Sequence, residues 1–230
     1  PGMGGMQALI WASAYPRRVF ACATVAAAAR QSAQNIAFAE LGRQAIMADP
    51  DWRNGGYLQH GVRPGKGANV ARTATLIAGL PEADVRAKFD SARAKERFSF
   101  ALESAEAPRV QNGGYVDRFD ANSFLYLSRA MDGFDLAGDF GGRLANAFQG
   151  GATRHAVFAF TSDWRYPLEE SRAVARALIA GGAETSYVEI QTDAGHDAYL
   201  GEEPAFESAL TGFIDSAATA RGLALHGGAG

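Results

Sequence analysis

Three short stretches with the pattern of β-strands constrain the fold of this chain more than any other feature. They are VFACATV (Val19–Val25), HAVFAF (His155–Phe160) and TSYVEI (Thr185–Ile190). The first is a short, continuous apolar run, which is typical of a strand buried on both faces in a parallel sheet, and the third is rich in β-branched and aromatic residues. Amphipathic helical patterns follow the second and third stretches, at Pro167–Ala180 and Pro204–Ala220. Strands that alternate with helices predict an α/β fold.

The stretch between the first and second runs has a different pattern. From residue 30 to residue 147 it is mostly helical in pattern, with almost no strand signals. The candidate helices are Ile36–Ala48, Val70–Ile77, Glu82–Phe89 and Phe124–Asp132. A long helical insertion between strands is commonly a lid over an active site. We therefore expect a core formed by residues 1–29 and 148–230, and a helical lid formed by residues 30–147.

Composition excludes several classes of function. The net charge is −3 and no basic run is present, so we expect no nucleic-acid partner. No stretch approaches the ~20 apolar residues of a membrane span, so we expect no membrane partner. The single cysteine, Cys22, cannot form an internal disulfide, which favours a reducing compartment and a cytoplasmic location. The histidines lack the spacing of metal ligands, and we predict no metal site.

The first residues have the pattern of a strand-to-helix elbow. The stretch PGMGGMQALIWASAY joins a glycine-rich hinge directly to an apolar helical pattern, Met3–Tyr15. In α/β hydrolases such an elbow carries the nucleophile and normally has the sequence Gly-x-Ser-x-Gly. Here Gly2 occupies the place of the serine.

Two residues that follow predicted strands could perform acid–base chemistry. Asp163 lies in FTSDWRYP after the second strand, and His196 lies in TDAGHDAYL after the third. Ligands of open parallel sheets bind outside the carboxyl ends of the strands. A histidine takes the proton of a nucleophile, and an aspartate holds its imidazole in the required tautomer. The order elbow, aspartate, histidine is that of the α/β hydrolases.

Several stretches together resemble the homoserine O-acetyltransferase family of α/β-hydrolase-fold acyltransferases. The most specific is ARQSAQNIAFAELGRQAIMADPDWRNGGY (Ala29–Tyr57). The others are MGGMQALIWASAYPRRV, RFDANSFLYLSRAMDGFDLA, FTSDWRYP and GHDAYL, and the resemblance covers nearly all of the 230 residues. It implies the C-terminal part of an α/β-hydrolase fold, with a parallel sheet in three layers, a helical lid insertion and a start at the nucleophile elbow.

The resemblance also implies an activity. Members of the family are acyltransferases of methionine biosynthesis that transfer an acetyl group from acetyl-CoA to the hydroxyl of homoserine. They do so through an acyl-serine intermediate, with ping-pong kinetics. The implied partners are therefore small-molecule substrates, with acetyl-CoA as co-substrate and no bound cofactor. Lid helices of the family commonly pair, so we expect a homodimer, with apolar surface from Ile36, Phe38, Leu41 and Ile46.

The family's functional residues can be carried over where the motifs match. Asp163 and His196 fall on the acid and the base, and Met3 falls on the residue whose backbone N–H lends half of the oxyanion hole. Asp197 falls on the carboxylate that receives the substrate amino group, and Arg72 on a lid arginine that meets the substrate carboxylate. One anion and one cation suit an amino-acid zwitterion, because buried charges must be paired.

Two positions depart from the family pattern. Gly2 replaces the nucleophilic serine, and Gly79 stands where the family has a tyrosine seven residues after the arginine. Glycine has no side chain to acylate, so the chain as written should not perform the family reaction. A catalytically inactive relative and an artificial junction at Gly2 are both open alternatives. Ester hydrolysis is a third, since it uses the same triad and differs in whether water is excluded.

Overall fold

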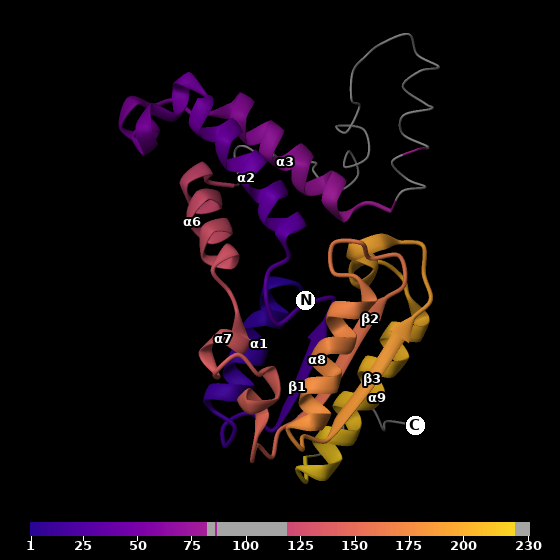
Figure 1. Ribbon diagram of the computed structural model, residues 1–230. Helices are drawn as coiled ribbons and strands as arrows, with labels where there is room; N and C mark the ends of the chain where they lie inside the picture. The colour runs from indigo at the N-terminus through magenta and orange to yellow at the C-terminus, as the bar shows by residue number, and fades with distance from the viewer. Residues whose placement is uncertain (82–85, 87–118, 224–230) are drawn as a thin grey trace. The chain divides into compact units, whose positions relative to one another are not determined.

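The computed structural model describes residues 1–81, 86 and 119–223 (Figure 1). The chain divides into two compact units. The first consists of Pro1–Arg30 with Phe134–Gly230, and the second of Gln31–Gly133.

The second unit ends earlier than the lid expected from the sequence. The prediction placed the return to the core at residue 148, whereas the first unit resumes at Phe134. Leu136 and Phe148 pack into one buried cluster with Leu9, and the Leu136 N–H donates to the carbonyl of Ala29 at 2.9 Å. These contacts join residues 134–147 to the core as soon as the chain re-enters it.

A parallel sheet lies at the centre of the first unit. Its described strands are β1 (Ala21–Val25), β2 (Arg154–Phe160) and β3 (Thr185–Ile190), in the order β1-β2-β3. Both neighbouring pairs are parallel. All of β2 after its first residue is buried, which explains why its sequence shows no polar alternation. The predicted parallel sheet is confirmed.

One face of this sheet is covered by the helices α1 (Met3–Ala14) and α8 (Leu168–Ala180) (Figure 1). Leu9 of α1 and Val174 of α8 pack in one buried cluster with Val157 of β2. The short elements α7 (Leu136–Asp139) and η4 (Leu144–Phe148) contribute to the same cluster. Apolar side chains of α1 and α8 therefore remove this face from water.

The opposite face packs against α9 (Pro204–Ala220). Phe206 of this helix makes edge contacts with both Phe158 and Phe160, with ring centroids 5.4 Å apart in each pair. Val157 and Phe158 are neighbours in β2 but belong to different clusters, because successive strand side chains point to opposite faces. The result is the expected three-layer arrangement of helix, sheet and helix.

The described part of the second unit is helical. Its elements are α2 (Ala33–Ala48), η1 (Pro50–Gly55), η2 (Tyr57–His60), α3 (Gly65–Gly79) and α6 (Ala121–Asp132). The helices predicted at Ile36–Ala48, Val70–Ile77 and Phe124–Asp132 are confirmed, each with an earlier start. The one predicted at Glu82–Phe89 lies outside the described residues, apart from residue 86.

Helices α2 and α3 approach each other closely at Gly67. A β-carbon on residue 67 would lie only 2.4 Å from the backbone oxygen of Ala45, so this contact requires glycine. The N–H of Gly67 donates to Asp49 Oδ2 at 2.9 Å, which fixes the start of α3. The same packing buries Ile46, which is 1% exposed. The expectation that Ile46 offers surface for a dimer is therefore wrong, whereas Leu41 of α2 is 54% exposed.

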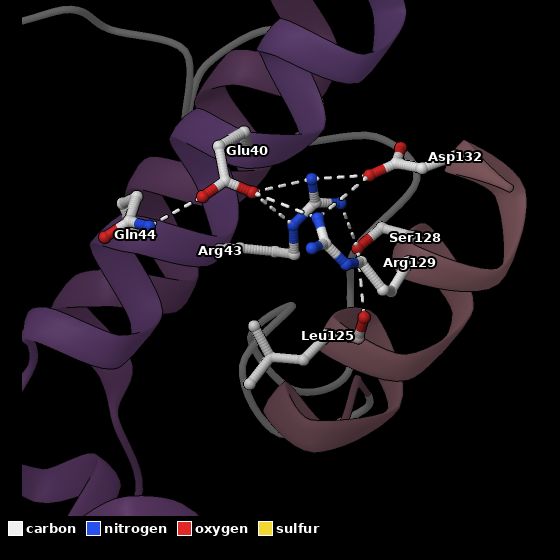
Figure 2. A network of polar contacts seen from close by, with 7 residues as sticks. All are labelled: Glu40, Arg43, Gln44, Leu125, Ser128, Arg129 and Asp132. Atoms are coloured by element: carbon white, nitrogen blue, oxygen red, sulfur yellow. Dashed lines mark hydrogen bonds and ion pairs between the residues drawn. The ribbon is translucent and has the colours of Figure 1, made fainter.

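A buried arginine joins α2 to α6 (Figure 2). Arg43 is only 4% exposed, and its guanidinium contacts carboxylates on both helices. Its Nη2 atom lies 2.7 Å from Glu40 Oε2 and 2.6 Å from Asp132 Oδ2, and Nη1 donates to Ser128 Oγ at 3.1 Å. A buried charge is tolerated when it is paired and hydrogen-bonded. These contacts hold α2 and α6 together within the second unit.

Candidate active site

The two residues predicted to perform acid–base chemistry lie side by side in the first unit. His196 Nδ1 is 2.8 Å from Asp163 Oδ2, and both residues are buried. The second carboxylate oxygen, Asp163 Oδ1, accepts the backbone N–H groups of Arg165 and Tyr166, each at 2.9 Å. A carboxylate oxygen only accepts, so Nδ1 carries the proton of the pair and Nε2 presents a lone pair.

Hydrogen bonds between two loops hold this pair in place. Asp163 follows β2, and His196 lies in η5 (Gly195–Leu200), which follows β3. Thr161 Oγ1 donates to the carbonyl of Thr192 at 3.1 Å and accepts the Thr192 N–H at 3.0 Å. Ser162 Oγ accepts the N–H of Gly195 at 2.9 Å. Because β2 and β3 are parallel neighbours, their loops meet at one edge of the sheet and these bonds lock them together.

Gly2 lies against the free side of the imidazole. Its backbone has φ 51° and ψ −121° directly before α1, and its N–H donates to the carbonyls of Val25 and Ala26 at 3.1 and 3.2 Å. A β-carbon on residue 2 would lie 3.7 Å from His196 Nε2. The structure thus brings residue 2, His196 and Asp163 together in the geometry that a nucleophile, base and acid require.

The other predicted site residues lie in different places. Met3 is the first residue of α1, so its backbone N–H belongs to the positive end of the helix dipole. Asp197 follows His196 in η5 and is exposed. Arg72 is half-buried on α3 of the second unit, where Gly79 is the last residue. The roles of Met3, Asp197 and Arg72 stay predictions.

Two aromatic residues beside His196 were missed by the sequence analysis. The ring of Tyr166 lies 5.2 Å from the imidazole, and the ring of Tyr199 lies 5.8 Å from it in an edge contact. The Tyr166 ring would also lie 4.0 Å from a β-carbon on Gly2. Both tyrosines stand inside the quoted motifs DWRYP and GHDAYL, so the signal was their place next to the acid and the base.

Outside the pair of Asp163 and His196, the described residues give no sign of a reactive thiol or a metal site. Cys22 is buried in β1, and burial raises the pKa of its thiol. No group of three or more histidine, cysteine, aspartate or glutamate side chains suited to a metal occurs among the described residues. None of the helices in the described ranges is long and apolar enough to cross a membrane.

Sequence comparison finds relatives of this chain along nearly its whole length. Over 226 residues the chain is 54% identical to homoserine O-acetyltransferase from Mesorhizobium japonicum. The aligned region covers 96% of this chain and 58% of that protein. This chain is a homologue of the homoserine O-acetyltransferases. The resemblance expected from the sequence is confirmed, and the chain spans somewhat more than half of that relative's length. No family model matches the sequence.

Solved structures identify the fold. The crystal structure of homoserine O-acetyltransferase from Bacillus anthracis matches with a TM-score of 0.78 at 23% identity, over 93% of this chain and 58% of that chain. An acetylester hydrolase from Corynebacterium glutamicum matches with a TM-score of 0.73 at 20% identity, over 93% and 60% respectively. This chain therefore has the C-terminal part of the α/β-hydrolase fold.

Proposed function

We propose that the chain carries the acid–base part of an acyltransferase site. The reaction is the transfer of an acetyl group from acetyl-CoA to the hydroxyl of homoserine or a similar amino-acid-like acceptor. The observation that carries the proposal is the buried Asp163–His196 pair, whose Nε2 faces residue 2. A site without acid–base chemistry has no need for such a pair, and the homology with homoserine O-acetyltransferases supports acyl transfer.

Each residue has a distinct role in this proposal. His196 takes a proton from the attacking hydroxyl and returns it to the leaving thiolate, while Asp163 stabilises the charged imidazole. The Met3 N–H faces the oxyanion that develops on the acetyl carbonyl. Asp197, the residue after His196 in η5, binds the amino group of the acceptor. The family route through an acyl-serine needs a hydroxyl at residue 2, which Gly2 lacks.

The decisive experiment restores that hydroxyl by the substitution Gly2→Ser in the full-length protein. We expect acetyl-CoA to acetylate Ser at this position with a burst of free thiol, because His196 is already oriented to accept its proton. Loss of a triad member costs on the order of a million-fold in kcat, so the gain should be of similar size. Intact-mass spectrometry of the acetylated protein and thiol release measure the two products.

Gly2→Ala is the matched control for this experiment. Alanine and serine impose the same backbone requirement at φ 51°, and only serine has a hydroxyl. Acetylation of the serine variant alone supports the proposal. If the Gly2→Ser protein stays folded, binds acetyl-CoA and is not acetylated, the better interpretation is a catalytically inactive relative, which is the second candidate and is favoured by the absence of a side chain at Gly2.

Two further parts of the proposal concern hydrolysis and assembly. Ester hydrolysis uses the same triad, and product analysis with and without homoserine separates it from transfer. A homodimer through the helices of the second unit remains part of the proposal and is supported by exposed apolar side chains such as Leu41 and Met47 on α2.

A further inference from the structure

Gly2 leaves room beside the catalytic nitrogen. A β-carbon on residue 2 would make only ordinary contacts, at 3.7 and 3.9 Å from His196 Nε2 and Cε1 and at 4.0 Å from Tyr166 Cε2. With glycine this point holds no side-chain atom of residue 2. On this side of Nε2, residue 2 therefore places no side-chain atom in the way of an acceptor hydroxyl.

The polar groups around this point favour a hydroxyl as the occupant. Nδ1 of His196 is committed to Asp163, so Nε2 is the nitrogen that can accept a proton. The N–H of Gly2 is bonded to the carbonyls of Val25 and Ala26 and does not compete for the incoming group. The rings of Tyr166 and Tyr199 pack on the imidazole, which keeps Nε2 aimed at residue 2.

We propose that this chain, with glycine at residue 2, transfers an acyl group directly from a thioester to a hydroxyl acceptor without an acyl-enzyme. The inference rests on the proposed function, because it uses the same donor, acceptor and base. It differs in the nucleophile, which is the hydroxyl of the acceptor itself. Room for that hydroxyl exists because Gly2 has no side chain.

The atoms of this reaction balance without a protein nucleophile. The proton of the acceptor hydroxyl moves to His196 Nε2 while the acceptor oxygen forms a bond to the thioester carbonyl carbon. The carbon–sulfur bond then breaks, and the thiolate takes the proton back from Nε2. The products are an ester and a free thiol, and His196 returns to its neutral form. Asp163 stabilises the imidazolium that exists between the two proton transfers.

Direct transfer makes a kinetic prediction that differs from the family route. Both substrates must be bound together, so reciprocal plots at several acceptor concentrations should intersect. A route through an acyl-enzyme gives the parallel lines of ping-pong kinetics. The unaltered protein should therefore show intersecting lines and no covalent acetyl group, whereas the Gly2→Ser protein should show parallel lines and an acetylated residue 2.

The experiment measures thiol release from acetyl-CoA against homoserine concentration for the unaltered protein and four variants. His196→Ala and His196→Asn should each lower its rate by about 100-fold, the usual contribution of general-base catalysis. Gly2→Ala should also lower it, since the β-carbon fills the space that the acceptor hydroxyl needs. Gly2→Ser reports on the proposed function. Thermal unfolding identifies any variant that has lost its fold.

The outcomes separate the two proposals. If Gly2→Ser is acetylated but the unaltered protein shows no transfer that depends on His196, direct transfer is overturned and the proposed function stands. Parallel lines or a covalent acetyl group in the unaltered protein also overturn it. If neither protein reacts with acetyl-CoA, both proposals fail. The kinetic pattern of the unaltered protein decides the question even if a histidine variant does not fold.

Discussion

Two buried histidines lie near opposite ends of the strands of one sheet, and their surroundings differ. His196 follows the carboxyl end of β3 and is paired with Asp163 at 2.8 Å. His155 lies at the start of β2, and its Nδ1 is buried with no hydrogen-bond partner in the described part of the chain. The two are 5% and 3% exposed. Burial is therefore not what makes a histidine reactive; the difference is the partner that holds the ring.

The surroundings of His155 keep it neutral. Its ring makes an edge contact with Phe148, with centroids 5.7 Å apart, and a small cavity beside it is lined by residues such as Ala12, Pro16 and Ala183. Burial lowers the pKa of His155 to about 4. No acid or base chemistry near neutral pH is expected from a group with these neighbours.

The largest expected difference between the two histidines is in kcat, and it is measured by replacing each of them separately in the Gly2→Ser protein. His196→Ala should reduce kcat on the order of a million-fold, because the serine loses its base. His155→Gln should leave kcat within about threefold of its parent, since His155 is at the other end of the strands and surface or core changes away from a site act mainly on stability. Steady-state thiol release measures both. A large loss of kcat in a folded His155→Gln protein would contradict the distinction.

The next test concerns the pH dependence of stability. The unfolded chain protonates His155 with a pKa near 6.5, whereas the folded protein does so only at about 4. The unfolded state therefore binds the proton first as pH falls, so stability is complete above about pH 6.5 and is lost down to pH 4. The loss is about 3 kcal/mol over the whole window and about 2 kcal/mol between pH 7 and pH 5.

Urea unfolding at pH 7 and pH 5 measures this effect by difference. The His155→Gln protein should lose about 2 kcal/mol less than the unaltered protein over that interval, because glutamine does not titrate. The groups common to both proteins cancel in the comparison. Equal losses in the two proteins would show that His155 is not held neutral by its surroundings.

The smallest expected effect concerns backbone strain at the end of the sheet that holds His196. Residue 2 has φ 51° and ψ −121°, so Gly2→Ala should cost about 1–2 kcal/mol, the penalty of a sparsely populated backbone conformation for a residue with a β-carbon. Gly4 lies in the first turn of α1, and an added β-carbon there would have nothing within 4 Å. Gly4→Ala should instead stabilise by up to about 1 kcal/mol. Thermal unfolding distinguishes a destabilising from a stabilising substitution. A Gly2→Ala protein as stable as its parent would show that the backbone of residue 2 is not strained.

Sequence alone predicted the sheet and the pairing of Asp163 with His196. The first two strands were predictable because their sequences are nearly uninterrupted apolar runs, as buried strands of a parallel sheet require. The third was predictable because it is rich in β-branched and aromatic residues, although most of its residues are only half-buried or exposed. The acid and the base were predictable because parallel strands bring their carboxyl ends to one edge, whatever the intervening sequence. Periodicity also located the helices, although α3 begins at Gly65 rather than Val70.

Features that depend on a packing partner were not predictable in this way. Ile46 is apolar on an amphipathic helix, and only the close approach of α3 shows that its face is interior. Arg43 would be read as a solvated charge until Asp132 and Ser128 are placed beside it. The boundary at Phe134 depends on contacts of Leu136 with segments distant in sequence. Each needs knowledge of which elements meet.

The pairing of β1 with β2 has a consequence for how the chain folds. Val25 lies opposite Phe158 in the register, and the whole of the second unit separates these two paired strands in the sequence. Closing so long a loop costs entropy before any sheet contact offsets it, and proteins dominated by such distant pairings fold slowly. The helices α2 and α3 need no such closure, because they are near neighbours in sequence. We therefore expect them to form first and the sheet to assemble late, with the apolar residues of β1 exposed to aggregation in the interval.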